Sequence, residues 1–155
     1  MVATKEYKVI GTRPIRPDGT DKVTGRAQYG ADIHLTGMLY GRVKRSPHAH
    51  AVIKKIDASK ALAVPGVLAV ITGQDLAKYN LHWMPTLMSD TQMVLPVEKV
   101  MYQAQEVAAV LATSRYAAAD GADAVRVEYE PLPVVIDPRK ALEPGAPVLR
   151  TDKKD

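Results

Sequence analysis

Two continuous apolar runs of strand length constrain the fold of this chain most. Residues 67–72 read VLAVIT and residues 107–112 read VAAVLA. Uninterrupted apolar runs of this length with β-branched residues are typical of strands buried on both faces. We therefore expect both runs inside the core, and the first of them at the centre of a sheet.

Each run belongs to a strand, helix, strand pattern. In the first unit, a strand at 51–56 precedes a short helix at 60–63, which Asp57 or Ser59 can cap and which Pro65 and Gly66 end. The pattern predicts an α+β fold, that is a mixed α/β domain, with a mixed sheet and two main helices.

The second unit pairs the run at 107–112 with a helix at 115–123. This helix is rich in Ala and is capped by Ser114, whereas Gly121 weakens it. Apolar and charged residues then alternate over 125–130, which predicts a strand with one solvent-facing side.

Other segments are predicted with less regular patterns. Residues 38–45 and 51–56 indicate a bent or hairpin-like pair of strands around the break at residues 46–47, and residues 134–136 a short edge strand. Residues 73–97 show no sustained period, so we expect a long loop with one helical turn at its start. Its part 81–97 is too apolar for free solvent and is a candidate interface.

Length and composition predict one domain. The chain has 155 residues, of which 46% are hydrophobic and 25% charged. We expect an extended arm at 1–20, the domain itself at 21–140 and a linker at 141–155. The chain shows neither a transmembrane run nor a charged-then-apolar leader, so a cytoplasmic location is expected.

Absence of cysteine and the distribution of charge exclude several classes of function. With no Cys, the chain has no disulfide, no thiolate nucleophile and no cysteine-held metal cluster. Residues 1–60 carry twelve Lys and Arg against five acidic residues, whereas residues 61–155 carry nine against twelve. The basic half lacks an aromatic stacking platform, so we expect no nucleic-acid binding. A solvated face or an acidic protein partner fits better.

Two of the four histidines are candidate metal ligands. His48 and His50 are two residues apart and would share a strand face, which could suit a metal. His34 and His82 stand alone, so no third ligand is near. Local hydrogen bonding in a turn is the simpler interpretation, and we expect no metal site.

The remaining polar motifs also have structural interpretations. Glu128 and Glu130 could form an acid/base pair, although strand alternation places both on the solvent side. The segments 22–25 (KVTG) and 72–75 (TGQD) lack the spaced glycines of a phosphate loop and are interpreted as turns. Gln103 and Gln105 could donate to a ligand, but we expect them to satisfy loop backbone.

Several motifs in order resemble one enzyme family over about residues 16–150. They are DGTDKVTG at 18–25, GMLYG at 37–41, RSPHAHA at 45–51, PGV at 65–67, YQAQEVA at 102–108 and EYEPLP at 128–133. Together they resemble the N-terminal α/β hammerhead domain of the molybdenum-binding large subunit in the xanthine dehydrogenase and aldehyde oxidase family.

Three segments most resemble the aerobic carbon monoxide dehydrogenase branch. They are HWMPT at 82–86, DTQMV at 90–94 and QAQEV at 103–107. Most xanthine dehydrogenase-like members have a Val-Gly-Gln-Pro-Val type of segment at the last position. The opening at 16–25 is generic for the family, which leaves an aldehyde or an N-heterocycle open as the substrate.

The resemblance implies the activity and the partners of a parent enzyme. That enzyme would hydroxylate its substrate oxidatively with water, at molybdenum bound by molybdopterin cytosine dinucleotide. In the carbon monoxide branch CO would become CO2, with copper beside molybdenum. Electrons would pass to an iron–sulfur small subunit and an FAD medium subunit.

The same resemblance places the catalytic and cofactor residues outside this chain. The cofactor loops, catalytic glutamate and copper-holding cysteine of the family follow the hammerhead domain, so no catalytic, cofactor or metal residue is assigned here. We expect a scaffold that packs on the cofactor-binding domains and is inactive alone, either as a fragment or as a split subunit. An independent non-enzymatic binding module is the alternative.

Overall fold

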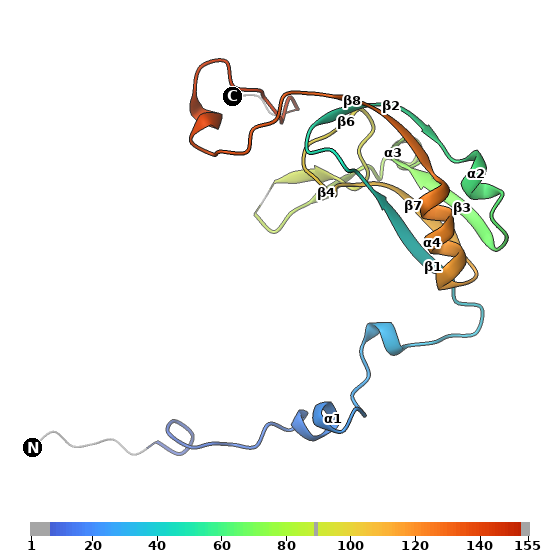
Figure 1. Cartoon of the computed structure of the whole chain (residues 1–155). Coiled ribbons are helices and arrows are strands. Elements are labelled where there is room, and N and C mark those ends of the chain that lie inside the picture. The colour runs from blue at the N-terminus through green and yellow to red at the C-terminus, as the bar shows by residue number, and fades with distance from the viewer. Residues whose placement is uncertain (1–6, 89, 153–155) are drawn as a thin grey trace, which may run out of the picture. The chain divides into compact units, whose positions relative to one another are not determined.

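The chain consists of two compact units, residues 1–36 and residues 37–155. Figure 1 shows the computed structural model, which describes residues 7–88 and 90–152. In the first unit, α1 (Gly19–Val23) and the 3-10 turn η1 (Gly30–Asp32) are joined by extended backbone. None of its described residues is buried. The boundaries predicted at residues 20 and 140 stay predictions.

The second unit contains the predicted strands and helices in nearly the predicted order. Its elements are β1 (Tyr40–Arg45), β2 (Ala51–Asp57), α2 (Ser59–Leu62), β3 (Val67–Thr72), α3 (Gly73–Lys78), β4 (Trp83–Pro85), β5 (Thr91–Met93), β6 (Lys99–Val100), β7 (Glu106–Ala112), α4 (Arg115–Ala124), β8 (Arg126–Pro131) and the 3-10 turn η2 (Lys140–Leu142). The prediction of a mixed α/β domain is confirmed.

The strands form three small sheets instead of the single mixed sheet that was predicted. One sheet has the order β1-β7-β3, the second β6-β2-β8, and β4 pairs with β5. Every pairing among the described residues is antiparallel. The predicted pairing of 38–45 with 51–56 is wrong, because β1 and β2 belong to different sheets. The pattern of apolar residues does not specify which strands pair. Here β1 pairs with β7, and β2 pairs with β6 and β8, all of them far along the chain.

Two further expectations about strands are corrected. The run at 67–72 lies at a sheet edge as β3, whereas β7 is central and consists of buried and half-buried residues. Residues 134–136 are not a strand. Pro131 and Pro133 remove two backbone donors just before them, which ends the ladder of β8.

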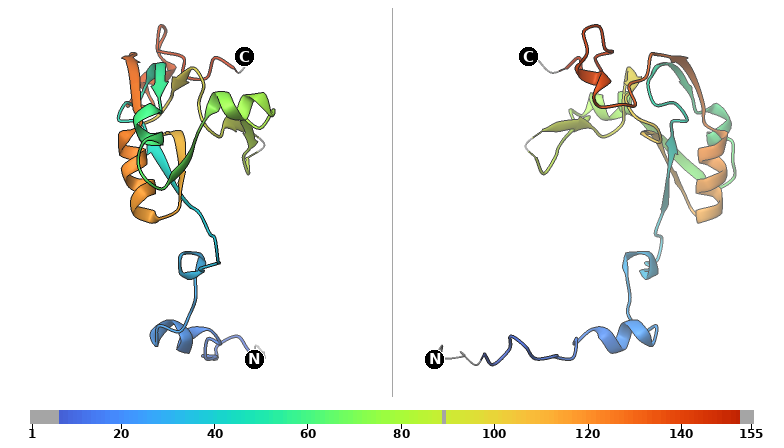
Figure 2. Two further views of the ribbon diagram at one scale, coloured as in Figure 1. Left: turned by 90° about the vertical axis from the view of Figure 1, so that its right-hand side faces the viewer. Right: turned by 60° about the vertical axis from the view of Figure 1, so that its left-hand side comes forward.

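Helix α4 covers one face of the first sheet. It contacts β1 and β7 and, less extensively, β3, and Figure 2 shows the helix, in orange, alongside these strands. The predicted cap is confirmed, because the Ser114 hydroxyl accepts from the Ala117 amide at 3.1 Å. For α2, the Asp57 carboxylate accepts from the Ser59 amide at 2.9 Å.

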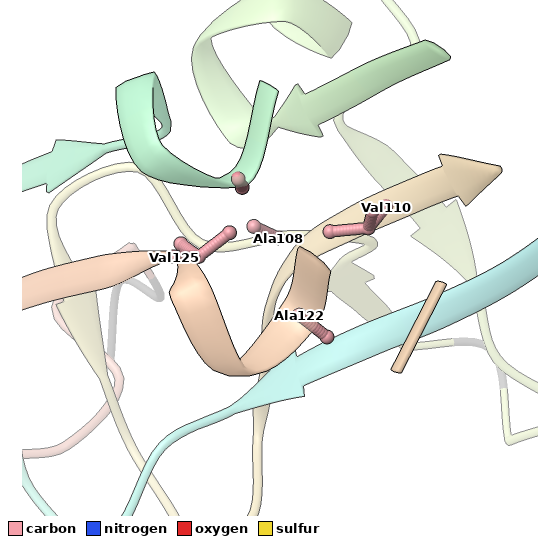
Figure 3. Packing of buried hydrophobic residues seen from close by; sticks show 5 residues of the cluster. Ala108, Val110, Ala122 and Val125 are labelled. Atoms are coloured by element: carbon pink, nitrogen blue, oxygen red, sulfur yellow. The ribbon is translucent and has the colours of Figure 1, made fainter. Parts of the chain in front are cut away.

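The core lies between α4, α2 and the strands behind them. Its main cluster consists of Ala61, Ala108, Val110, Ala122 and Val125, with four of these labelled in Figure 3. These side chains are small, so helix and sheet approach closely. A second cluster, Ala51, Val100 and Val107, joins the central strand of the first sheet to the second sheet.

Gly121 has a packing role in α4 that the sequence did not reveal. A Cβ atom there would lie 2.7 Å from Val67 Cγ2 and 2.9 Å from Val110 Cγ1. Both distances are below van der Waals contact, and both partners are branched strand residues with restricted rotamers. Gly121 therefore permits the close contact of α4 with β3 and β7.

We predict that Gly121→Ala destabilises the protein although alanine favours helix. The gain in helix propensity is about 1 kcal/mol, and the overpacking costs about 1–3 kcal/mol. Urea unfolding followed by circular dichroism measures the balance. The control is Asp120→Ala, at the exposed neighbouring position. A Gly121→Ala midpoint at or above that of the unmodified chain would contradict the packing role.

Candidate interaction surface

The turn between β1 and β2 is held by a hydrogen-bonded junction with the loop before β7. The Ser46 amide donates to the Gln105 carbonyl, and the Ala104 amide donates to the Ser46 carbonyl, each at 2.9 Å. The Ser46 hydroxyl also closes the turn, because it accepts from the His48 amide at 3.0 Å. Ser46 is 3% exposed, so these bonds are shielded from water.

Gln105 completes this junction from the other side. Its side-chain oxygen accepts from the Met101 amide at 2.7 Å, and the residue is 3% exposed. The prediction that a glutamine here satisfies loop backbone is confirmed for Gln105. Gln103 is exposed, and its side chain lies at the surface.

Ala104 adopts an unusual backbone conformation between these two glutamines. Its φ is +66°, in the left-handed region that costs an L-residue about 1–2 kcal/mol. Arg45 donates to the Ala104 carbonyl at 2.8 Å, and the Ser46 bond holds the Ala104 amide. This chain has alanine where the Val-Gly-Gln-Pro-Val pattern has glycine, so two bonds hold a conformation that glycine adopts freely.

The two histidines of the same turn have different partners. The His48 ring packs edge-on against Tyr129, with centroids 5.0 Å apart. His50 Nδ1 donates to the Pro133 carbonyl at 2.7 Å. Among the described residues no group of three or more His, Asp or Glu side chains could hold a metal ion. His50 thus makes the local hydrogen bond that was predicted for this turn, whereas the His48 ring makes an aromatic contact.

An ion pair lies at the rim of the junction. The Arg45 guanidinium contacts the Glu106 carboxylate at 2.5 Å, and Tyr102 donates to the same carboxylate at 3.5 Å. The backbone amide of Glu106 itself, and then Arg45, lower the pKa of that carboxyl. Burial and the nearby carboxylate raise the pKa of Tyr102.

Each of the remaining polar candidates has its own local environment. Glu128 and Glu130 are both exposed on β8, and Glu130 pairs with Lys54, as the solvent-face interpretation predicted. Residues 22–25 form the turn that ends α1, with Gly25 at φ +72°. His34 is exposed, whereas His82 is half-buried with its ring 6.0 Å from that of Trp83.

The TGQD segment at 72–75 caps α3 instead of forming a phosphate cradle. The Asp75 carboxylate accepts from the Thr72 hydroxyl at 2.7 Å and from its amide at 3.0 Å. The Thr72 hydroxyl, and then Lys78, lower the pKa of Asp75 to about 2. Gly73 is required here, since a Cβ would lie 2.5 Å from the Leu95 carbonyl oxygen.

The segment predicted as a long loop contains α3 and an exposed hairpin. The Thr86 amide donates to the Asp90 carbonyl at 2.7 Å and closes the turn between β4 and β5. Both strands have three residues and are too short to show a period, so the sequence did not predict them. Trp83, Met84, Leu87 and Met88 are all exposed, the last two by 104% and 88%. We call these four residues the hairpin patch.

Arg150 anchors this hairpin from a segment predicted to be a linker. Its guanidinium donates to the Thr91 carbonyl at 2.9 Å and to the Asp90 carboxylate at 3.3 Å. Asp152 pairs with the same guanidinium at 2.6 Å and raises the pKa of Arg150. No sequence signal could have found this contact, because about sixty residues separate the partners.

The hairpin patch is the candidate interaction surface. Such side chains, when grouped and exposed, mark protein interfaces more often than free surface. None of the helices that the structure describes has the length and apolar character that a membrane crossing needs.

Comparison with known proteins places this architecture in a defined group. Residues 24–133 match the family described as aldehyde oxidase and xanthine dehydrogenase, a/b hammerhead domain. The carbon monoxide dehydrogenase large chain of Afipia carboxidovorans is 59% identical over 94% of this chain. The match spans 18% of that relative, so this chain corresponds to about a fifth of it.

Solved structures agree with the sequence comparison. The crystal structure of a Cu,Mo-CO dehydrogenase in the carbon monoxide reduced state superposes with a TM-score of 0.88 at 54% identity. That alignment covers 94% of this chain and 18% of the other. Quinoline 2-oxidoreductase from Pseudomonas putida 86 gives a TM-score of 0.77 at 38% identity, covering 91% and 19%. The predicted hammerhead fold is confirmed.

The two glutamines provide a matched test of the junction. We predict that Gln105→Leu lowers the free energy of unfolding by about 1–3 kcal/mol, because the amide of half-buried Met101 loses its acceptor. Gln103→Leu, at the exposed position, should change it by less than about 0.5 kcal/mol. Chemical unfolding of both variants checks this, and equal effects would contradict a structural role specific to Gln105.

The capping of α3 predicts a dependence of stability on pH. The folded pKa of Asp75 is about 2 against 3.8 in the unfolded chain. The carboxylate therefore stabilises the fold fully above pH 3.8, and this contribution is lost as pH falls through about 2. Asp75→Asn should be less stable at pH 6 by roughly 0.5–1 kcal/mol.

Thermal unfolding at several pH values tests this expectation. The difference between Asp75→Asn and the unmodified chain should shrink between pH 4 and pH 2. Asp21→Asn, in the other unit, is the control for general charge effects. A difference that stays constant with pH would show that the carboxylate charge does not contribute.

Proposed function

The chain belongs to the aldehyde oxidase and xanthine dehydrogenase family, as an a/b hammerhead domain, and we propose that it serves as a scaffold within a molybdenum hydroxylase large subunit. Its likeness to the carbon monoxide dehydrogenase large chain supports this. The observation that carries the proposal is the hairpin patch, an exposed apolar surface on a domain whose described residues gather no cluster of metal-ligating side chains.

The proposed reaction of the whole enzyme is that of the carbon monoxide branch. CO and water give CO2, two protons and two electrons, and the electrons pass to an iron–sulfur subunit and an FAD subunit. The identity of 59% with a carbon monoxide dehydrogenase large chain supports this substrate over an aldehyde or an N-heterocycle. At 38% identity, quinoline 2-oxidoreductase is the more distant relative.

Among the described residues, no cluster of His, Asp or Glu side chains is suited to hold molybdenum. The described residues bring no three potential ligands together, and His50 Nδ1 already donates to a carbonyl. A related structure is described as containing copper and molybdenum. We propose that molybdopterin cytosine dinucleotide, with its molybdenum and copper, is held by other domains of the same large subunit, and that this chain alone is inactive.

The hairpin patch is proposed to pack against those domains. Leu87 and Met88 form its tip, and Trp83 lies at its base on β4. Arg150 donates to the Thr91 carbonyl and the Asp90 carboxylate, so the hairpin that carries the patch is restrained on its β5 side. A held apolar surface loses less conformational entropy on docking than a mobile one.

We predict that serine at positions 83, 87 and 88 prevents assembly without unfolding the domain. A large chain of Afipia carboxidovorans carbon monoxide dehydrogenase with residues 1–155 in place of its matched segment is the test protein. The triple variant Trp83→Ser, Leu87→Ser and Met88→Ser should lose most CO-dependent dye reduction and most assembled complex in size-exclusion chromatography. Burial of exposed apolar residues supplies about 1.5–3 kcal/mol each.

The control replaces apolar residues that are equally exposed elsewhere. Leu62→Ser, Tyr116→Ser and Leu142→Ser change residues that are 52%, 84% and 89% exposed. Assembly should persist in this control. An active, assembled triple variant of the hairpin patch would disprove its role. A chimera that contains the unmodified chain and still fails to assemble and oxidise CO would disprove the proposed scaffold role in a carbon monoxide dehydrogenase large chain.

A further inference from the structure

The sheet β1-β7-β3 has a second apolar face, opposite α4. The pairing register puts Gly41 beside Leu111 and Val43 beside Ala109. On the other side of β7, Ala69 pairs with Leu111 and Ile71 with Ala109. Because paired residues point to the same side of a sheet, these six residues share one face. We call them the open face: Gly41, Val43, Ala69, Ile71, Ala109 and Leu111.

The two faces of this sheet differ in burial. Ala108, Val110 and Ala112 point toward α4 and are 0% exposed. Their neighbours on β7, Ala109 and Leu111, are only half-buried. Among the described residues, the hydrophobic clusters of the core include no residue of the open face.

The composition of the open face is that of an interior. All six residues are apolar, although alternate positions of a solvent-facing strand normally carry polar side chains. Three of the six are glycine or alanine, so the backbone of a second layer could approach closely. The continuous apolar runs in β3 and β7 are typical of strands covered on both sides, and the described chain covers one side.

The relatives indicate what lies on this face. In the carbon monoxide dehydrogenase large chain, the segment that matches this chain is 18% of the length. Most of that polypeptide is therefore available beside the hammerhead domain. A two-layer arrangement of α4 and sheet becomes a three-layer one when a further element covers the open face.

We propose that the open face is a docking surface for an apolar element from the molybdenum-binding remainder of the large chain, an inference that rests on the proposed function. The contact is separate from the hairpin patch, since its residues belong to another sheet. It gives the central strand β7 its second cover. We expect the docking element to present apolar side chains, because all six residues of the open face are apolar and none can pair with a charged or polar group.

Single cysteines test this proposal directly, because the chain contains none. Ala109→Cys places a thiol on the open face with little change in volume. Ala108→Cys is the buried reference beneath α4, and Ala63→Cys is an exposed reference just after α2. Labelling with a maleimide, followed by peptide mass spectrometry, is measured in the 155-residue chain and in the chimeric large chain described above.

In the isolated chain we expect Ala109→Cys to label much faster than Ala108→Cys. In the chimera, its labelling rate should fall by at least about tenfold, toward that of Ala108→Cys, because a covered thiol is not accessible to the reagent. Ala63→Cys should label equally in both proteins.

Three results would overturn the proposal. One is unchanged labelling of Ala109→Cys in a folded chimera, and another is protection in the isolated monomer. The third is protection in the isolated chain that disappears on dilution, which would assign the face to a second copy. Protection of Ala109→Cys in a chimera that cannot oxidise CO would instead contradict the proposed scaffold role in an active enzyme and leave the docking surface supported.

Discussion

The arrangement of this domain depends on the backbone junction between Ser46 and Gln105. The chain leaves one sheet at Arg45 and enters another at Ala51, and only five residues separate the two strands. Two hydrogen bonds of 2.9 Å tie this crossing to the loop before β7. Because Gln105 precedes the central strand directly, the same contact sets where β7 begins between its two neighbours. The strained conformation of Ala104 is tolerated only because its amide and carbonyl are both bound there.

Small residues allow the next level of organisation. Ala108 and Val110 on β7 pack against α4 near Gly121 and Ala122. The helix and the strand are so close at Gly121 that a larger side chain would not fit there. Helix α4 covers one face of the sheet β1-β7-β3. The opposite face is the open face, which we propose is covered by another part of the large chain. The domain therefore has two apolar surfaces that its own residues do not cover, the open face of the sheet and the hairpin patch. Both are expected of a part that functions within a larger polypeptide.

The polar residues illustrate how far spacing can be interpreted. His48 and His50 were the best candidates for a metal pair, yet their rings contact Tyr129 and the Pro133 carbonyl. The prediction of a local hydrogen bond is confirmed for His50, because a tight turn has many backbone groups to satisfy and few side chains to do so. The same reasoning holds for Gln105 and for the TGQD cap. Arg150 was missed because its partners on the hairpin are distant in sequence.

The sequence by itself determined the positions of the main strands, the Ser114 cap, the alternation on β8 and the family. These features are local or are written as contiguous motifs, so periodicity, capping chemistry and resemblance can detect them. Only the tertiary structure decided which strands pair, why Gly121 is in a helix, and that β3 lies at an edge. Strand partners are selected by contacts between residues far apart in the chain. An apolar run indicates that a strand is covered, but it does not identify the helix, sheet or neighbouring domain that covers it.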